Sequence, residues 1–234
     1  SSDGTEKLRS RMLALNRDAA RYYYSVLQSQ EGAAVQAYLD KRRIRRGIAV
    51  RFGMGAAPDS WDALLTAMTH KGYTKQELIS AGLAVNGKNG RLYDKFRNRL
   101  MLPVIDVRGD VVGFGSRVLD KSEPKYMNTP ETLTYSKRRI LYGMNLAKKS
   151  KRSNIILCEG NLDVVTLHQA GFDNAVASMG TALTQEQLRL LSRYTKELVL
   201  CYDNDNAGQQ ATRRALELLN NSEFSVKVLQ LPRR

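Results

Sequence analysis

The sequence predicts an α/β protein in which a strongly basic α+β subdomain precedes a parallel sheet flanked by helices. Short apolar strands alternate with helical segments over residues 154–229, a pattern typical of parallel sheets covered by helices. The charge changes at the same place: residues 1–153 contain 29 Lys and Arg against 14 Asp and Glu, whereas residues 154–234 contain 8 against 9. We therefore expect a basic domain over residues 1–150 and a second domain over residues 151–234.

The charge distribution favours some functional classes, and other features exclude further ones. An excess of positive charge confined to one part of a chain favours a nucleic-acid surface, with a merely solvated face as the alternative. No apolar run approaches the length of a transmembrane helix, and the polar start SSDGTEKLRS lacks the apolar core of a signal peptide. Two cysteines, Cys158 and Cys201, are too few for a disulfide scaffold or a Cys-rich zinc module, and they fit a reducing cytoplasm.

The first part of the chain predicts four helices and one hairpin. Apolar residues recur there at steps of three and four, Thr74 offers an N-cap and Gly82 offers a stop. The expected helices span residues 6–29, 32–40, 61–68 and 74–81. Residues 101–107 and 111–118 predict a β-hairpin, and residues 121–142 predict an irregular basic segment rich in turn residues.

The second part alternates strands and helices. The expected strands span residues 154–158, 174–178, 198–202 and 224–229. The expected helices span residues 161–170, 184–194 and 207–219. Thr184 and Gln187 have the spacing of a capping box and predict where the second of these helices begins.

Acidic residues follow two of these strands. Glu159 comes directly after the first strand and precedes Gly160, while Asp203 and Asp205 come after the third. Because active groups of a parallel sheet collect beyond the carboxyl ends of its strands, we expect the three carboxylates to face one ligand. Three carboxylates without His or Cys favour Mg²⁺ or Mn²⁺ over zinc, and such a site suits phosphoryl transfer. The alternative is that Asp203 or Asp205 caps the helix that follows.

Two long runs then point to a known family of domains. The runs CEGNLDVVTLHQAGFDNAVASMGTALTQEQLRLL (158–191) and LVLCYDNDNAGQQATRRALELL (198–219) resemble the Toprim domain of primases, topoisomerases and some nucleases. The resemblance implies that Glu159, Asp203 and Asp205 are metal-binding and catalytic acids. It also implies a metal-site role for Asp163, which matches a further acid of bacterial primases.

The basic part distinguishes among Toprim proteins. Motifs of bacterial DnaG-type DNA primases are resembled, in chain order, by YLDKR (38–42), YDKFRNRLMLP (93–103), GFGSR (113–117), PKYMNTPET (124–132) and YSKRRILYG (135–143). The chain departs from the pattern at Arg43, where a glycine is common, and at Lys95, Asn161 and Asn204. None of these departures removes a metal acid or a motif lysine.

The resemblance also implies which basic residues contact nucleotide or template. These are Arg97, Arg99, Lys125, Tyr126, Asn128 and Lys137. Arg97 and Arg99 are two residues apart, so in extended backbone they would present both guanidinium groups to one side. For each of these residues, a solvated or packed surface side chain is the alternative.

As a whole, the resemblance implies the RNA-polymerase core of a primase. We expect it to make short RNA primers on a single-stranded DNA template from ribonucleoside triphosphates, with Mg²⁺ or Mn²⁺ as cofactor. The resemblance also implies a bacterial cytoplasmic protein at the replication fork, with no membrane partner and with a replicative helicase reached through a domain outside this chain. The alternatives are a Toprim enzyme that cleaves DNA, such as a topoisomerase or nuclease, and a non-catalytic module with a vestigial metal site.

Overall fold

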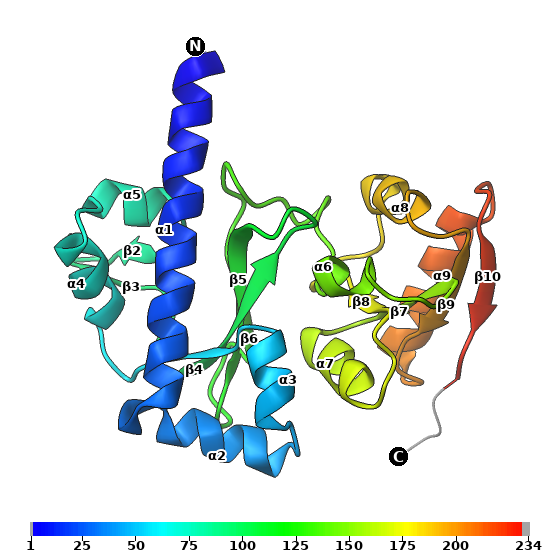
Figure 1. Cartoon of the computed structure of the whole chain (residues 1–234), viewed down its shortest axis with the longest axis horizontal. Helices are drawn as coiled ribbons and strands as arrows, with labels where there is room; N and C mark the ends of the chain where they lie inside the picture. Colours follow the sequence, from blue (N-terminus) through cyan, green and yellow to red (C-terminus); the bar gives the residue numbers. More distant parts are fainter. Residues whose placement is uncertain (1, 231–234) are drawn as a thin grey trace. The chain divides into compact units, whose positions relative to one another are not determined.

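The computed structural model describes residues 2–230, and its chain divides into two compact units (Figure 1). Unit 1 comprises Ser1–Val104 and Asp110–Ser136, and unit 2 comprises Ile105–Gly109 and Lys137–Arg234. Unit 1 contains an antiparallel sheet with helices, and unit 2 contains a parallel sheet. The predicted α/β class is thereby confirmed.

The units change over at a different place from the predicted boundary at residue 150. Residues 137–150 pack with the parallel sheet, because Leu141, Met144 and Ala147 are buried in its core. Tyr142 also forms backbone hydrogen bonds with Ala177 of that sheet. The charged connector at residues 148–153 therefore lies inside unit 2.

Unit 1 is built around its first helix. Its helices are α1 (Ser2–Gln28), α2 (Ala33–Lys41), α3 (Arg46–Arg51), α4 (Ala63–His70) and α5 (Lys75–Ser80), with a 3₁₀ turn η1 at Gln30–Gly32. Its four-stranded sheet has the order β1 (Gly55–Ala57), β4 (Arg99–Ile105), β5 (Val111–Val118) and β6 (Tyr126–Asn128). Strands β2 (Ala84–Asn86) and β3 (Leu92–Asp94) form a separate antiparallel pair. Leu15, Tyr23 and Phe114 are fully or almost fully buried where α1 packs on this sheet.

The predictions for unit 1 are confirmed for its long elements and miss its short ones. All four expected helices form, Thr74 completes a capping box with Glu77, and Gly82 has the left-handed φ of 72°. Helix α3 was missed because six residues with three of them basic or glycine show no clear apolar period. Strand β1, GAA, has no β-branched residue to reveal it. Strand β6 corrects the expectation that residues 121–142 are wholly irregular.

Unit 2 is a four-stranded parallel sheet in the order β10, β9, β7, β8. Its strands are β7 (Asn154–Cys158), β8 (Ala175–Ala177), β9 (Glu197–Cys201) and β10 (Ser225–Val228). Its helices are α6 (Met144–Ala147), α7 (Asn161–Gln169), α8 (Gln185–Ser192) and α9 (Asn206–Leu219). Every strand and long helix predicted for this region is present, and the Thr184–Gln187 capping box is confirmed. The four-residue helix α6 was not predicted.

Two further expectations concern the cysteines and the membrane. Cys158 and Cys201 are free and buried, and they face each other in register on the neighbouring strands β7 and β9. Within residues 2–230, no helix has the length and apolar character needed to cross a membrane.

Candidate functional site

The predicted acids of unit 2 gather at the carboxyl ends of β7 and β9. These strands are neighbours and end together, with Cys158 opposite Cys201. The chain continues into Glu159 on one strand and into Asp203 two residues beyond the other. The backbone N–H of Asp203 donates to Glu159 Oε1 at 3.0 Å. Residues 44 positions apart in sequence are thus brought together by the strand pairing, as the sequence predicts.

Two of the acids also cap helices. Asp205 Oδ1 accepts a hydrogen bond from the Gly208 N–H at 2.7 Å at the start of α9. Asp163 Oδ2 accepts from the Gly160 N–H at 3.2 Å at the start of α7. The alternative reading of the D-x-D pair therefore holds for Asp205. It does not exclude a ligand role, because capping occupies one carboxylate oxygen of each residue.

A glycine in α9 makes this arrangement possible. A Cβ on Gly208 would lie 1.8 Å from the backbone oxygen of Asp203 and 2.8 Å from Glu159 Oε1. Both distances are shorter than any real contact, and the nearer atom belongs to the backbone. Gly208 therefore allows the first turn of α9 to approach the end of β9.

The site carries concentrated negative charge. Burial raises the pKa of the Glu159 carboxyl above its ordinary value, and the charges of Asp203, Asp205 and Asp163 raise this pKa further. The hydrogen bond from the Asp203 N–H lowers the same pKa without reversing the shift. A nearby cation would relieve this repulsion.

The donor set fits a hard divalent cation, because all four side chains offer carboxylate oxygens. In the conformation described for residues 2–230, no three His, Cys, Asp or Glu side chains are close enough to hold an ion. Glu159 Oε1 and Asp205 Oδ1 are turned toward backbone N–H groups instead. The chemistry of the donors thus matches the predicted Mg²⁺ or Mn²⁺, and side-chain rotation would be needed to complete the ligand set.

A cavity of about 270 Å³ borders Glu159 within unit 2. The loop of residues 180–183 forms one wall, and Tyr202 and Arg214 contribute to the others. Arg214 therefore supplies a cation on α9 next to the acidic edge. The cavity offers room for part of a substrate beside the carboxylates.

In unit 1, Arg97 lies among aromatic rings. Its guanidinium carbon is 4.2 Å from the centre of the Trp61 ring and 5.0 Å from that of Tyr93. It also donates to the Asp94 carbonyl at 2.6 Å. Trp61 and Tyr93 line a cavity of about 310 Å³ to which Lys88 and Arg91 also contribute. Trp61 is 65% exposed, so a large aromatic face and several cations meet at the surface here.

The shared orientation expected for Arg97 and Arg99 is wrong. Asn98 between them has a φ of 50°, so the backbone is not extended there. Arg99 is buried, and its guanidinium donates to the carbonyls of Pro124 and Lys125. Arg99 therefore holds the segment before β6 in place, which leaves its contact with nucleotide a prediction.

The remaining predicted residues lie on an edge strand and in a turn. The Lys125 side chain is exposed, and Tyr126 is 54% exposed on β6 with the Arg117 guanidinium 4.8 Å from its ring centre. Asn128 is half-buried on the same strand. In unit 2, Lys137 is half-buried, and its carbonyl accepts a hydrogen bond from Gln187 Nε2 at 3.1 Å.

Comparison with known proteins identifies the family. Residues 22–148 match the family described as the N-terminal domain of the DNA primase catalytic core, and residues 156–234 match a Toprim-like family. A DNA primase of Clostridium acetobutylicum is 47% identical over 223 residues, which are 95% of this chain and 37% of that protein. The chain belongs to the DnaG-type DNA primase catalytic core family.

Solved structures of this primase family agree with the fold. A DnaG primase catalytic domain bound to single-stranded DNA has a TM-score of 0.90 and 37% identity, covering 97% of this chain and 75% of that one. The RNA polymerase domain of the Mycobacterium tuberculosis primase DnaG has a TM-score of 0.88 and 39% identity, covering 96% and 76%. The chain spans about a third of the length of the curated primase relative from Clostridium acetobutylicum.

Reasoning from sequence missed the roles of two residues of unit 1, Trp61 and Asp94. Trp61 was assigned only to a helix, although an exposed tryptophan beside a basic segment could have identified a stacking surface. Asp94 is buried and accepts hydrogen bonds from the N–H groups of Leu64 at 2.8 Å and Leu65 at 2.9 Å. It thereby caps α4 from a distant part of the chain. Burial raises the pKa of Asp94 to about 6.

The departure from the primase pattern at Arg43 has a structural counterpart. Arg43 has a φ of 58°, the left-handed region that favours glycine. The arginine therefore occupies a position where its backbone is strained.

Proposed function

We propose that this chain is a catalytic core that joins ribonucleotides into RNA primers on a single-stranded DNA template. The observation that carries the proposal is the convergence of Glu159 and Asp203 through a 3.0 Å hydrogen bond at the carboxyl edge of the parallel sheet. That edge is where parallel sheets hold phosphate-bearing ligands. Membership of the primase family supports the assignment of this edge to nucleotidyl transfer.

Glu159, Asp203 and Asp205 would hold a divalent cation, Mg²⁺ or Mn²⁺, with Asp163 as a further acid. When bound, such a cation neutralises phosphate charge and lowers the pKa of an attacking hydroxyl. The chain's own residues fix the spacing of the carboxylates through the β7–β9 register, the Asp205 cap and the close approach at Gly208. Catalysis here would come mainly from positioning and charge stabilisation.

Basic and polar residues of the two units would contact the nucleotide and template. Lys125, Tyr126 and Asn128 lie on or beside the edge strand β6 of unit 1, and Lys137 is the first residue of the second segment of unit 2. We assign these four residues and Arg97 to nucleotide or template contacts. Arg99 would act indirectly, because its guanidinium donates to the carbonyls of Pro124 and Lys125 and so positions Lys125. The Trp61 ring offers a face on which a template base can stack. Any helicase contact lies outside this assignment.

The test is synthesis of short RNA by the 234-residue chain on a single-stranded DNA oligonucleotide, with labelled ribonucleotides and Mn²⁺. Asp203→Asn should lower the rate by about 10³-fold, because a neutral amide is a much weaker ligand than a carboxylate. Glu217→Gln is the matched control, since Glu217 is an exposed acid on α9 away from the strand ends. It should keep the rate within about two-fold.

Three results would count against the proposal. Equal loss in Asp203→Asn and Glu217→Gln would show that general charge, not the acidic edge, matters. Metal-dependent nicking of supercoiled DNA, without RNA synthesis, would favour a DNA-cleaving Toprim enzyme instead. A chain that binds DNA but performs neither reaction, with its affinity unchanged in Asp203→Asn, would support a non-catalytic module.

A further inference from the structure

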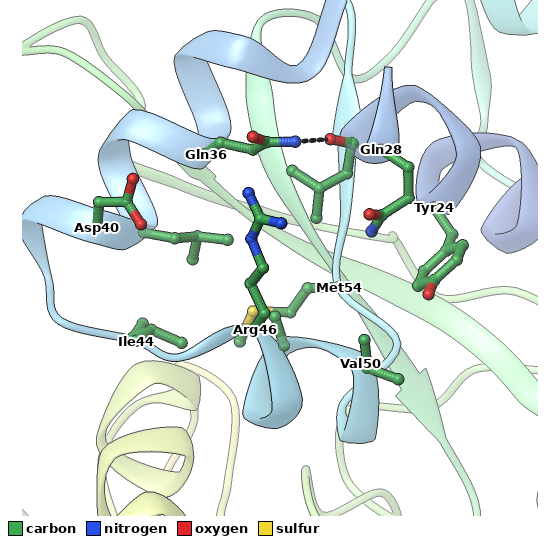
Figure 2. Close-up of a pocket in the computed structure, with 11 residues that line it drawn as sticks. Tyr24, Gln28, Gln36, Asp40, Ile44, Arg46, Val50 and Met54 are labelled. Carbon is green, nitrogen blue, oxygen red and sulfur yellow. Dashed lines mark hydrogen bonds between the residues drawn. The ribbon is translucent and has the colours of Figure 1, made fainter. Parts of the chain in front are cut away.

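A cavity of about 140 Å³ opens between the end of α1, helix α2 and helix α3, away from the predicted nucleotide and template residues in the sequence (Figure 2). Its walls are mainly aliphatic and come from Leu27, Leu39, Ile44, Ala49, Val50 and Met54. Val50 is 53% exposed and Tyr24 is 36% exposed, so the apolar walls continue to the surface. An aliphatic cavity of about this volume is known to accept a benzene ring.

An arginine projects into the cavity. Figure 2 shows the Arg46 guanidinium rising from α3 toward the space between Gln36 and Gln28. Across residues 2–230 this guanidinium forms no hydrogen bond or ion pair. Gln36 differs, because its amide nitrogen donates to the Leu27 carbonyl at 2.5 Å. Arg46 is therefore available for an anionic group that enters with an apolar one.

The cavity is bordered by strongly basic sequence. Residues 40–51 contain six Lys and Arg against one acid, Asp40. Arg43 within this run keeps an arginine at a φ of 58°, where glycine would be unstrained. Strained backbone of this kind tends to persist where a side chain serves a function. The cavity therefore lies beside a concentration of positive charge.

We propose that this cavity docks an acidic protein segment. One apolar side chain of the segment, aromatic or large aliphatic, fills the space between α1, α2 and α3. A carboxylate of the same segment then pairs with Arg46, and the net positive charge of residues 40–51 attracts the segment. The opposite charges give the partner its orientation, and the buried side chain supplies most of its affinity.

A nucleic acid fits this cavity less well than a peptide does. A nucleobase carries several donors and acceptors, whereas six of the eleven wall residues are apolar and the Gln36 amide already donates to the Leu27 carbonyl. Burying the base edge there would leave polar groups without hydrogen-bond partners, whereas a phenylalanine or leucine side chain has no polar group to satisfy. The aromatic surface that suits base stacking lies elsewhere in unit 1, at Trp61 and Tyr93.

The test uses fluorescein-labelled peptides that share a run of aspartates and differ at one position, which is Phe, Trp, Leu, Met or Ala. Binding to the 234-residue chain is measured by fluorescence anisotropy. The best apolar residue should bind at least about 10-fold more tightly than alanine. Arg46→Glu should weaken the binding of that peptide about 10-fold. Val50→Asp, at an exposed position on the rim, should do the same without affecting folding.

Arg51→Glu is the matched control, because Arg51 lies on the same helix, is exposed and does not line the cavity. It changes the net charge equally and should weaken binding by no more than about two-fold. Equal effects of Arg46→Glu and Arg51→Glu, or equal affinity for all the peptides, would reduce the interaction to charge attraction and overturn the proposal. If Val50→Asp instead lowers the affinity for single-stranded DNA, the cavity is a nucleic-acid site and the proposal is overturned.

Discussion

The two units organise their charged residues in opposite ways. In unit 2, the acids converge because two neighbouring parallel strands end together, so the backbone topology itself brings Glu159 to Asp203. In unit 1, the cations are distributed over helices, turns and an edge strand, and side-chain contacts decide which of them remain available. Arg99 is buried and donates to two carbonyls, whereas Arg97 donates to one carbonyl and lies over the exposed ring of Trp61. The strand order places the acidic residues of unit 2, whereas the packing of individual side chains determines which basic residues of unit 1 are exposed.

The largest expected effect tests whether the packing of α9 against the end of β9 positions the acids of unit 2. Gly208→Ala places a Cβ 1.8 Å from the Asp203 carbonyl oxygen and must separate α9 from the end of β9. We expect a cost above about 3 kcal/mol in the free energy of unfolding, as for a severe overpacking clash, together with loss of RNA synthesis. Chemical denaturation followed by circular dichroism measures the cost.

The control for that change is Gly47→Ala. Gly47 is also a helical glycine, but a Cβ there meets nothing within 4 Å. It should be neutral or stabilise the chain by up to about 1 kcal/mol. Similar destabilisation in both variants would contradict the importance of the close approach at Gly208.

The next effect concerns Asp94, a carboxylate of unit 1 that caps α4. Asp94→Ala removes both caps of α4 and should cost about 2–3 kcal/mol at pH 7. Because burial raises the pKa of Asp94 to about 6, the folded state binds this proton more tightly than the unfolded state does. Ionisation should therefore lower the free energy of unfolding by about 1–2 kcal/mol as pH rises from 4 to 6.5.

Asp94→Asn isolates the pH effect. The amide cannot ionise, so the difference between wild type and this variant should change over the same pH range and stay constant above it. A pH-independent difference would mean that burial does not raise the pKa of the Asp94 carboxyl.

A smaller effect tests the surface role of Trp61. Trp61→Ala should weaken single-stranded DNA binding about 5- to 10-fold, as for the loss of one stacked base, with little change in stability because the ring is exposed. Phe172→Ala is the matched control, since Phe172 is another exposed ring with an arginine, Arg152, 4.9 Å from its centre. Equal losses in the two variants, measured by fluorescence anisotropy, would contradict a specific stacking site.

The smallest effect sharpens the account of the basic run. Arg43→Gly relieves the left-handed backbone at a φ of 58° and should stabilise the chain by about 0.5–1 kcal/mol, after the entropy of the new glycine is allowed for. It should also remove about one counter-ion from the salt dependence of any polyanion bound there. A destabilised variant would show that contacts of the arginine outweigh its strain.

Sequence reasoning succeeded where periodicity or strand order determines the structure. The alternation of strands and helices over residues 154–229 predicted the parallel sheet and the position of Glu159 and Asp203 at the ends of neighbouring strands. That Glu159, Asp203 and Asp205 face one ligand stays a prediction, because no three of these side chains are close enough to hold an ion within the part of the chain that the structure describes. The alternation could not show that Asp205 also caps α9, nor that Gly208 is needed there, because both depend on contacts between successive elements.

Reasoning was weaker where single side chains decide. The spacing of Arg97 and Arg99 predicted a common direction, but the left-handed Asn98 between them changes the path of the chain. Short elements such as α3 and β1 hold too few residues to show a period, and the cavity beside α3 was invisible for the same reason. Long-range caps such as Asp94 leave no local signal.

The central claim is that the acidic edge of unit 2 binds a divalent cation through Glu159. The most direct measurement is Mn²⁺ binding to the 234-residue chain, followed by electron paramagnetic resonance, for wild type and Glu159→Gln. Glu217→Gln serves as the control for lost charge. The account predicts saturable binding that Glu159→Gln weakens at least about 10-fold and Glu217→Gln leaves within about two-fold. Equal affinity of wild type and Glu159→Gln for Mn²⁺ would contradict it.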